Sequence, residues 1–130
     1  MVDYYSKVVE RLGSLNLIIS PEDTLRIKHL ISKVDGYTRT ICNFTETEDL
    51  PTLITPAFVD EVVGEFLHEK VKSGLLDVEV AIKTIKEGDT SITYAYGDGS
   101  VAPEARLDSL VKGIENHYRT VIMRYRKISW

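Results

Sequence analysis

The chain has 130 residues, of which 43% are hydrophobic and 28% charged, and these values are typical of one globular domain rather than a disordered chain. The 16 basic and 20 acidic residues give a formal net charge of −4, which argues against a protein that coats nucleic acid with its whole surface. The single cysteine, Cys42, excludes an internal disulfide framework and a cysteine-based zinc cluster, and we expect it to be a buried, inert thiol.

Two helices are predicted in the first third of the chain. The first, over residues 3–13, has apolar residues on one face at spacings of four: Tyr4, Val8 and Leu12. The second, over residues 21–43, opens with a capping serine, Ser20, and with Pro21 in its first turn. Its apolar positions recur mainly at spacings of three and four: Ile27, Leu30, Ile31, Val34, Tyr37, Ile41 and Phe44.

A polar, acidic stretch over residues 45–52 predicts a loop, and a third helix is predicted over residues 56–73. Thr55 before Pro56 repeats the pairing of a capping residue with a proline. The apolar face of this helix is wide: Phe58, Val59, Val62, Val63, Phe66, Leu67 and Val71. Three carboxylates at spacings of four share another face and predict a solvated or subunit-facing acidic strip: Glu61, Glu65 and Glu69.

The sequence changes period over residues 78–97, where β-branched and aromatic residues alternate in two runs: Val78, Val80, Ile82 and Thr84, then Ile92, Tyr94 and Tyr96. This pattern predicts an extended arm or β-hairpin, and a short helix over residues 78–82 is the alternative. Because an isolated hairpin is marginally stable in water, we expect the helices or a neighbouring subunit to hold the arm. The candidate intersubunit residues are Ile82, Ile85, Gly88, Asp89, Ile92 and Tyr94.

A last helix is predicted over residues 103–126, beginning at Pro103. Its apolar stripe is long: Leu107, Leu110, Val111, Ile114, Tyr118, Val121, Ile122 and Tyr125. The sequence therefore predicts a mainly α fold, with one four-helix bundle-like domain over residues 1–130 and an extended arm between the third and last helices.

No residue pattern predicts a catalytic, cofactor-binding or metal site. His29, His68 and His117 fall on three different predicted helices, and none has a second histidine or a cysteine at the spacing of metal ligands. The two glycines within residues 97–100 lack the lysine and the strand-to-helix context of a phosphate-binding loop. We therefore expect no enzyme activity, no cofactor and no metal ion.

Basic and aromatic residues gather at the end of the last helix, where no acidic residue occurs from Arg119 to Trp130. Arginine, tyrosine and tryptophan are typical anchors of protein interfaces, which favours docking on a partner. The candidate docking residues are Arg124, Tyr125, Arg126, Lys127 and Trp130. Two alternatives remain open: contact with DNA through the cations and rings, or a solvated helix end.

Three short stretches, together with the order of the predicted elements, carry a family resemblance. They are LITPAF at residues 53–58, KEGDT at residues 86–90 and YRKISW at residues 125–130. Over almost its whole length the chain resembles the head-tail connector proteins of long-tailed double-stranded DNA phages and prophages, also called head-completion or DNA-packaging adaptors. It departs from the family pattern at Ile128 and Ser129, where a Leu-Arg pair is more usual, which puts a basic role of position 129 in doubt.

The resemblance implies a structural protein of the virion rather than an enzyme. It implies a helical subunit of a ring, expected to be dodecameric, that lies under the portal, extends the DNA channel and offers the docking site for the tail. The implied partners are the portal protein, a tail-side completion or stopper protein, further copies of this chain, and DNA that passes through the lumen without sequence-specific binding. The implied location is the head-tail interface of the virion, and the host cytoplasm during assembly, with no membrane and no cofactor involved.

Two other functions fit parts of the pattern. A small helical DNA-binding or regulatory protein would use the basic C-terminal cluster and would bind duplex DNA in a salt-dependent way. A tail-completion protein is the second alternative, and we expect such a protein to contain more β-strand.

Overall fold

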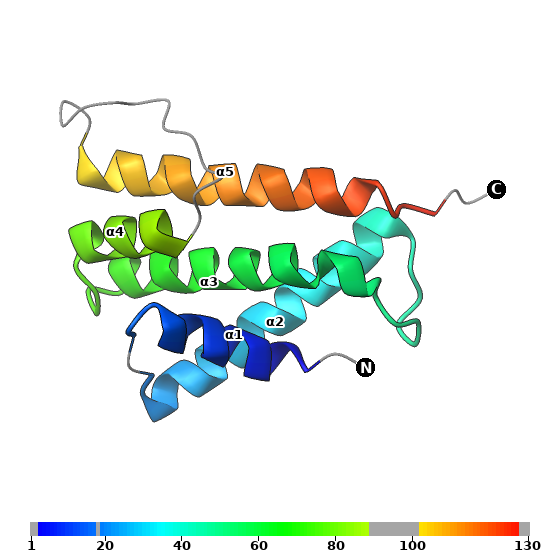
Figure 1. The fold of residues 1–130 in the computed structure, drawn as a ribbon, viewed down its shortest axis with the longest axis horizontal. Helices are drawn as coiled ribbons and strands as arrows, with labels where there is room; N and C mark the ends of the chain where they lie inside the picture. The colour runs from blue at the N-terminus through cyan, green and yellow to red at the C-terminus, as the bar shows by residue number, and fades with distance from the viewer. Residues whose placement is uncertain (1–2, 18, 89–101, 128–130) are drawn as a thin grey trace.

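The computed structural model describes residues 3–17, 19–88 and 102–127. The prediction of a mainly helical protein is confirmed, and the described residues form five α-helices and one short 3-10 helix, with no strand among them (Figure 1). In chain order they are α1 (Tyr4–Ser14), α2 (Pro21–Cys42), η1 (Thr52–Ile54), α3 (Thr55–Lys72), α4 (Val78–Gly88) and α5 (Pro103–Met123).

Helix α3 lies at the centre of the fold and contacts each of the other four α-helices. Figure 1 shows α5 and α4 on one side of α3, and α1 and the obliquely crossing α2 on the other. This position explains the wide apolar face of the α3 sequence, because a helix covered on several sides needs more than a single apolar stripe. None of the helices in the described part of the chain is both long and apolar enough to cross a membrane.

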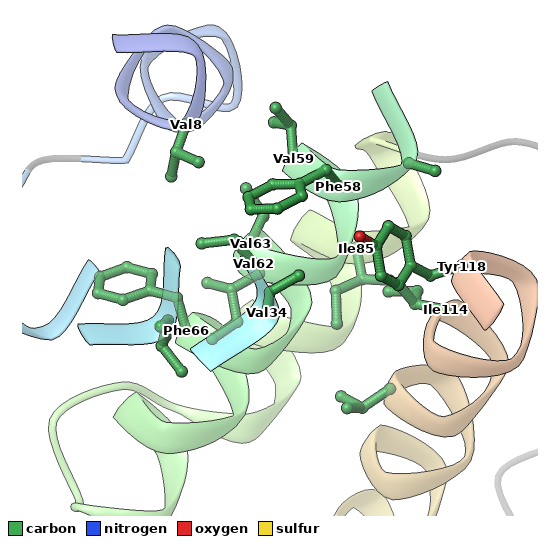
Figure 2. Packing of buried hydrophobic residues seen from close by; sticks show 14 of the residues in the cluster. Val8, Val34, Phe58, Val59, Val62, Val63, Phe66, Ile85, Ile114 and Tyr118 are labelled. Atoms are coloured by element: carbon green, nitrogen blue, oxygen red, sulfur yellow. The ribbon is translucent and has the colours of Figure 1, made fainter. Parts of the chain in front are cut away.

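Phe58 of α3 joins three helices in the core (Figure 2). Its fully buried ring stacks on Tyr4 of α1 at a centroid distance of 4.0 Å and meets Tyr118 of α5 edge-on at 6.1 Å. Further along α3, Gly64 allows close approach of α5, because a Cβ atom there would lie 3.0 Å from Cδ1 of Ile114. The contact between α3 and α5 therefore depends on the large ring of Phe58 and on the absence of a side chain at Gly64.

The predicted starts of α2, α3 and α5 agree with the structure to within a residue, and each helix has a proline in its first turn. The predicted cap Thr55 is instead the first residue of α3, and Ile54 holds the cap position. At the start of α2 the backbone N–H of Ser20 donates to the Asp23 carboxylate at 3.0 Å. Asp23 also receives Lys70 Nζ from the end of α3 at 3.1 Å, which ties the two helix ends together. The predicted last helix extends too far, since α5 ends at Met123 and residues 124–127 continue as a turn and a short segment.

The extended conformation predicted for residues 78–88 is wrong, because these residues form α4. Apolar residues also recur here at helical spacing, at Val78, Ala81, Ile82 and Ile85, whereas the alternating residue Val80 is 45% exposed. Helix α4 packs on α3 and α5. The side chain of Asp77 accepts a hydrogen bond from the backbone N–H of Glu79 at 2.8 Å and so caps the first turn. A helix satisfies its own backbone groups, so this segment does not need a paired strand.

Of the two supports expected for this segment, the helices rather than a neighbouring subunit hold its first half. Ile82 and Ile85 are 3% and 4% exposed within a single copy of the chain, so their apolar side chains are already buried. The candidate residues Asp89, Ile92 and Tyr94 lie outside the described residues. An intersubunit role for residues 89–97 stays a prediction.

Candidate functional site

The segment that follows α5 is bound to the end of α2 by backbone hydrogen bonds. The backbone N–H of Lys127 donates to the carbonyl of Cys42 at 2.9 Å, and the side-chain amide of Asn43 donates to the carbonyl of Lys127 at 2.7 Å. Asn43 has a left-handed backbone, with φ of 61°, which ends α2 and turns its side chain toward this segment. Residue 127 is therefore held on both sides by polar groups of α2 and its cap.

The side chain of Lys127 points back to the loop after α2. Its Nζ forms an ion pair with Glu48 and lies 5.1 Å from the ring centroid of Phe44. The Lys127 ammonium, and after it the backbone N–H of Thr45, lowers the pKa of the exposed Glu48 carboxyl. Lys127 thus serves as an anchor within the subunit.

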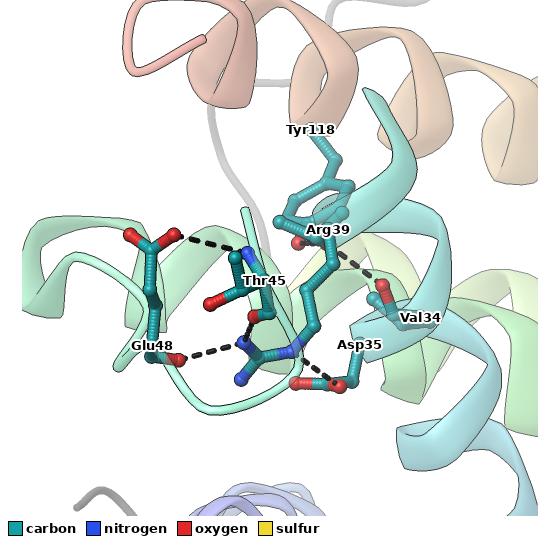
Figure 3. A network of polar contacts seen from close by, with 7 residues as sticks. Val34, Asp35, Arg39, Thr45, Glu48 and Tyr118 are labelled. Carbon is teal, nitrogen blue, oxygen red and sulfur yellow. Dashed lines mark hydrogen bonds and ion pairs between the residues drawn. The ribbon is translucent and has the colours of Figure 1, made fainter. Parts of the chain in front are cut away.

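The loop that receives Lys127 is itself braced by Arg39 of α2 (Figure 3). The guanidinium group donates to the Asp35 carboxylate at 2.9 Å and to the carbonyls of Thr45 and Glu48 at 2.5 and 2.6 Å. These are charge-assisted hydrogen bonds, which are stronger than neutral ones and fix the donor's geometry. The platform for the C-terminal segment therefore has a defined shape.

The other predicted docking residues divide into two groups. Tyr125 is half-buried and packs against the core, whereas Arg124 and Arg126 are exposed. Neither arginine makes an ion pair within residues 3–17, 19–88 and 102–127. Trp130 lies outside the described residues. The structure thus presents two exposed arginines on a segment whose next residue, Lys127, is anchored.

A second polar site lies between α2, α3 and α5, where a pocket of about 280 Å³ opens beside Glu61, Glu65 and Glu115. The expectation that Glu61 belongs to a solvated or subunit-facing strip is wrong, since its side chain lies in the interior and the residue is 6% exposed. Burial, and after it the nearby carboxylates of Glu65 and Glu115, raises the pKa of Glu61 to about 8. A carboxyl group with this pKa is mostly protonated at neutral pH.

The sequence prediction grouped Glu61 with Glu65 and Glu69 in an acidic strip, and it did not predict that Glu61 is buried. The available signal was its spacing, because Glu61 follows Phe58 by three residues and so lies near the same face of the helix as a core residue. Glu61 is buried because α5 packs over this edge of α3. Tyr118 from α5 closes the inner wall of the pocket.

The Tyr118 hydroxyl of α5 belongs to a chain of hydrogen bonds that ends on the backbone of α2. Thr38 Oγ1 donates to the Val34 carbonyl at 2.7 Å, so its lone pair receives the proton of the Tyr118 hydroxyl (Figure 3). Burial raises the pKa of Tyr118 above its ordinary value. This phenol is therefore neutral and its proton is already engaged.

The histidines and acidic residues do not assemble into a metal centre in the described part of the chain, where no group of three or more candidate ligands could hold an ion. His68 pairs instead with Asp108 of α5, with 2.7 Å between Nε2 and Oδ1. Cys42 is buried as expected, and its Sγ donates to the carbonyl of Ile122 at 3.2 Å. Burial raises the pKa of this thiol, which disfavours the reactive thiolate.

Comparisons of the chain with protein-family models, with curated proteins and with solved structures found no match.

Proposed function

We propose that this chain is a head-tail connector of a tailed phage, a head-completion adaptor that forms a ring under the portal. In this proposal the ring extends the DNA channel and provides the docking site for the tail. The observation that carries it is the C-terminal segment, where exposed Arg124 and Arg126 precede Lys127, which is bound to α2. The resemblance of residues 53–58, 86–90 and 125–130 to that family supports the same function.

The anchored segment has the physical properties of a docking element. Binding a mobile peptide costs conformational entropy, and a segment already held in place loses less on association. Arginine side chains are frequent anchors of protein interfaces because they pair with carboxylates in a bidentate way. We therefore assign Arg124 and Arg126 to contact with the portal, together with Trp130 beyond them.

The remaining contacts of the proposed assembly follow from ring symmetry. In a closed ring each copy presents one face to one neighbour and a different face to the other. Within this proposal the helices form a bundle-like body, and residues 89–97 reach a neighbouring copy in a dodecameric ring. A tail-side stopper protein binds the opposite end, DNA passes through the lumen without sequence-specific contacts, and the subunit has no catalytic role.

Mixing the chain with a phage portal protein, the partner named in the proposal, tests it. We expect a ring bound to the portal, visible by negative-stain electron microscopy and co-sedimenting with it. Replacing both arginines by glutamate (Arg124→Glu with Arg126→Glu) should abolish co-sedimentation while the helical circular dichroism signal stays unchanged. The matched control is Lys112→Glu, a charge reversal at an exposed position near the middle of α5.

Two outcomes would contradict the proposal. A wild-type chain that never joins the portal across a range of salt concentrations would remove the connector function. If the double variant binds the portal as tightly as the Lys112→Glu control does, the two arginines do not take part in docking.

The same exposed arginines also favour the DNA-binding alternative. That function predicts duplex binding whose affinity falls steeply with salt, because each phosphate contact releases counterions. A gel-shift series with the wild-type chain and the double glutamate variant separates the two functions. Tight binding to duplex DNA that the variant loses, in a chain that ignores the portal, would favour a regulatory protein.

A further inference from the structure

The pocket between α2, α3 and α5 combines acidic and aromatic walls. Helix α2 contributes Lys33 and Tyr37, α3 contributes Glu61 and Glu65, and α5 contributes Glu115 and Tyr118. Three carboxyl groups face about 280 Å³ of space that is neither fully enclosed nor flat surface. The walls therefore offer acceptors for hydrogen bonds together with two aromatic rings.

Glu61 is the deepest of the carboxyl groups and is left incompletely paired. The residue is 6% exposed, and its Oε2 has no hydrogen-bond partner among the residues that the structure describes. A buried polar atom without a partner costs free energy, and buried polar groups in proteins are nearly always satisfied. An unsatisfied carboxyl oxygen beside a pocket points to a donor that a ligand supplies.

The cation that lines the pocket does not fill this role. Lys33 Nζ lies 3.4 Å from Glu65 Oε1, and 62% of the lysine side chain is exposed. Lys33 therefore sits at the mouth, paired with the outer carboxylate. Among the described residues Glu61 Oε2 therefore still lacks a donor.

The chemistry of the walls selects the kind of cation. A metal ion does not fit, because no group of three or more ligands in the described ranges could hold one. A guanidinium group fits better, since it is planar, weakly hydrated, pairs with carboxylates through two parallel hydrogen bonds and stacks on aromatic faces. We propose that this pocket is a binding site for a guanidinium group, with Glu61 as the carboxylate that pairs with it.

Binding is coupled to a proton. The free pocket holds Glu61 mostly as the neutral acid at pH 7, because burial and the carboxylates of Glu65 and Glu115 raise its pKa to about 8. The other ionisable groups that line the pocket are Lys33 and Tyr37 from α2 and Tyr118 from α5. A guanidinium cation favours the ionised carboxylate, so binding releases one proton to solvent and strengthens as pH rises.

Methylguanidinium is the probe, and the carboxyl ¹³C resonance of Glu61 is the readout. We expect saturating methylguanidinium to lower the pKa of Glu61 by about one unit or more, and affinity to rise about tenfold or more from pH 6 to pH 9. Methylurea has a similar shape without the charge and should leave the resonance unchanged. Glu61→Gln should lose methylguanidinium binding, followed through the Tyr118 ring resonances, while the exposed Glu104→Gln should keep it.

A pKa of Glu61 that does not move, or equal affinity in Glu61→Gln and wild type, would overturn the proposal. A second arm finds the source of the group. If an arginine of another copy occupies the pocket, raising the wild-type concentration should shift the Glu61 resonance as methylguanidinium does, and a chain with Arg119, Arg124 and Arg126 changed to Gln should not. If methylguanidinium binds but raising the protein concentration does not shift the Glu61 resonance, the natural ligand is a free guanidinium compound. This part of the experiment does not depend on binding to the portal.

Discussion

Two buried carboxyl groups, one at the start of α2 and one in the middle of α3, differ in charge: the first is ionised at neutral pH and the second is mostly neutral. Asp23 is 2% exposed and Glu61 is 6% exposed, so burial alone would raise both pKa values. At Asp23 the effect of burial is outweighed by the backbone N–H of Ser20 and by Lys70, and the pKa is lowered. At Glu61 burial acts together with neighbouring carboxylates, and the pKa rises to about 8.

The difference shows that local partners decide whether a buried acid is charged. Asp23 lies at a helix start, where free N–H groups are present, and within reach of a lysine from the end of α3. Glu61 lies in mid-helix, where backbone N–H groups are used within the helix, and after burial its pKa is raised most by two other acids, Glu65 and Glu115. The ionised Asp23 therefore stabilises the fold at neutral pH through its partners, whereas Glu61 stays protonated there.

The largest expected effect concerns the pH dependence of stability at Glu61. Between its ordinary pKa of 4.5 and its folded pKa of about 8, the folded chain keeps the proton that the unfolded chain releases. The free energy of unfolding should therefore fall as pH rises through this window, by at most about 1.4 kcal/mol per pH unit. Glu61→Gln should flatten this slope and exceed the wild type in stability at pH 9. Urea unfolding from pH 4 to pH 9 measures both, and equal slopes would mean that Glu61 is solvated.

The second largest effect is expected at the buried pair of Asp23 and Lys70. Lys70→Met removes the cation and leaves Asp23 buried with its helix-start hydrogen bond alone. We expect a loss of about 2–4 kcal/mol at pH 7, since removing one member of a buried pair strands the other charge. The pKa of Asp23 should rise in the same variant. Lys72→Met, at an exposed position on the same turn, is the control and should unfold at nearly the wild-type urea concentration.

The smallest effect is expected at the exposed pair of Lys127 and Glu48. Lys127→Met removes the charge but keeps the backbone hydrogen bonds of residue 127, so stability should change little and the change should disappear in high salt. Because Lys127 lowers the pKa of Glu48, this small contribution is present at neutral pH and is lost as pH falls through the folded pKa. A loss as large as that of Lys70→Met would mean that the pair is shielded from water. Thermal unfolding at low and high salt measures the difference.

Four of the five helices could be predicted from local signals. A capping residue with a proline marks the starts of α2 and α3, and a proline opens α5. Helix α4 was predicted only as an alternative, and only over residues 78–82, because Val78, Val80 and Ile82 fit a period of two as well as a helical one. The deciding position is Ala81, which is fully buried but too small to stand out in an apolar pattern.

The sequence by itself determined the helical class, the helix starts and the basic, acid-free end of the chain, because these depend on spacing and on residues adjacent in the chain. Tertiary structure alone decided which charges are paired. Glu61 meets Glu115 only because α5 packs on α3 around Gly64, and Lys127 meets Cys42 only because the chain returns to the end of α2. Such contacts join residues far apart in sequence, and their energies depend on burial and distance, which residue order does not contain.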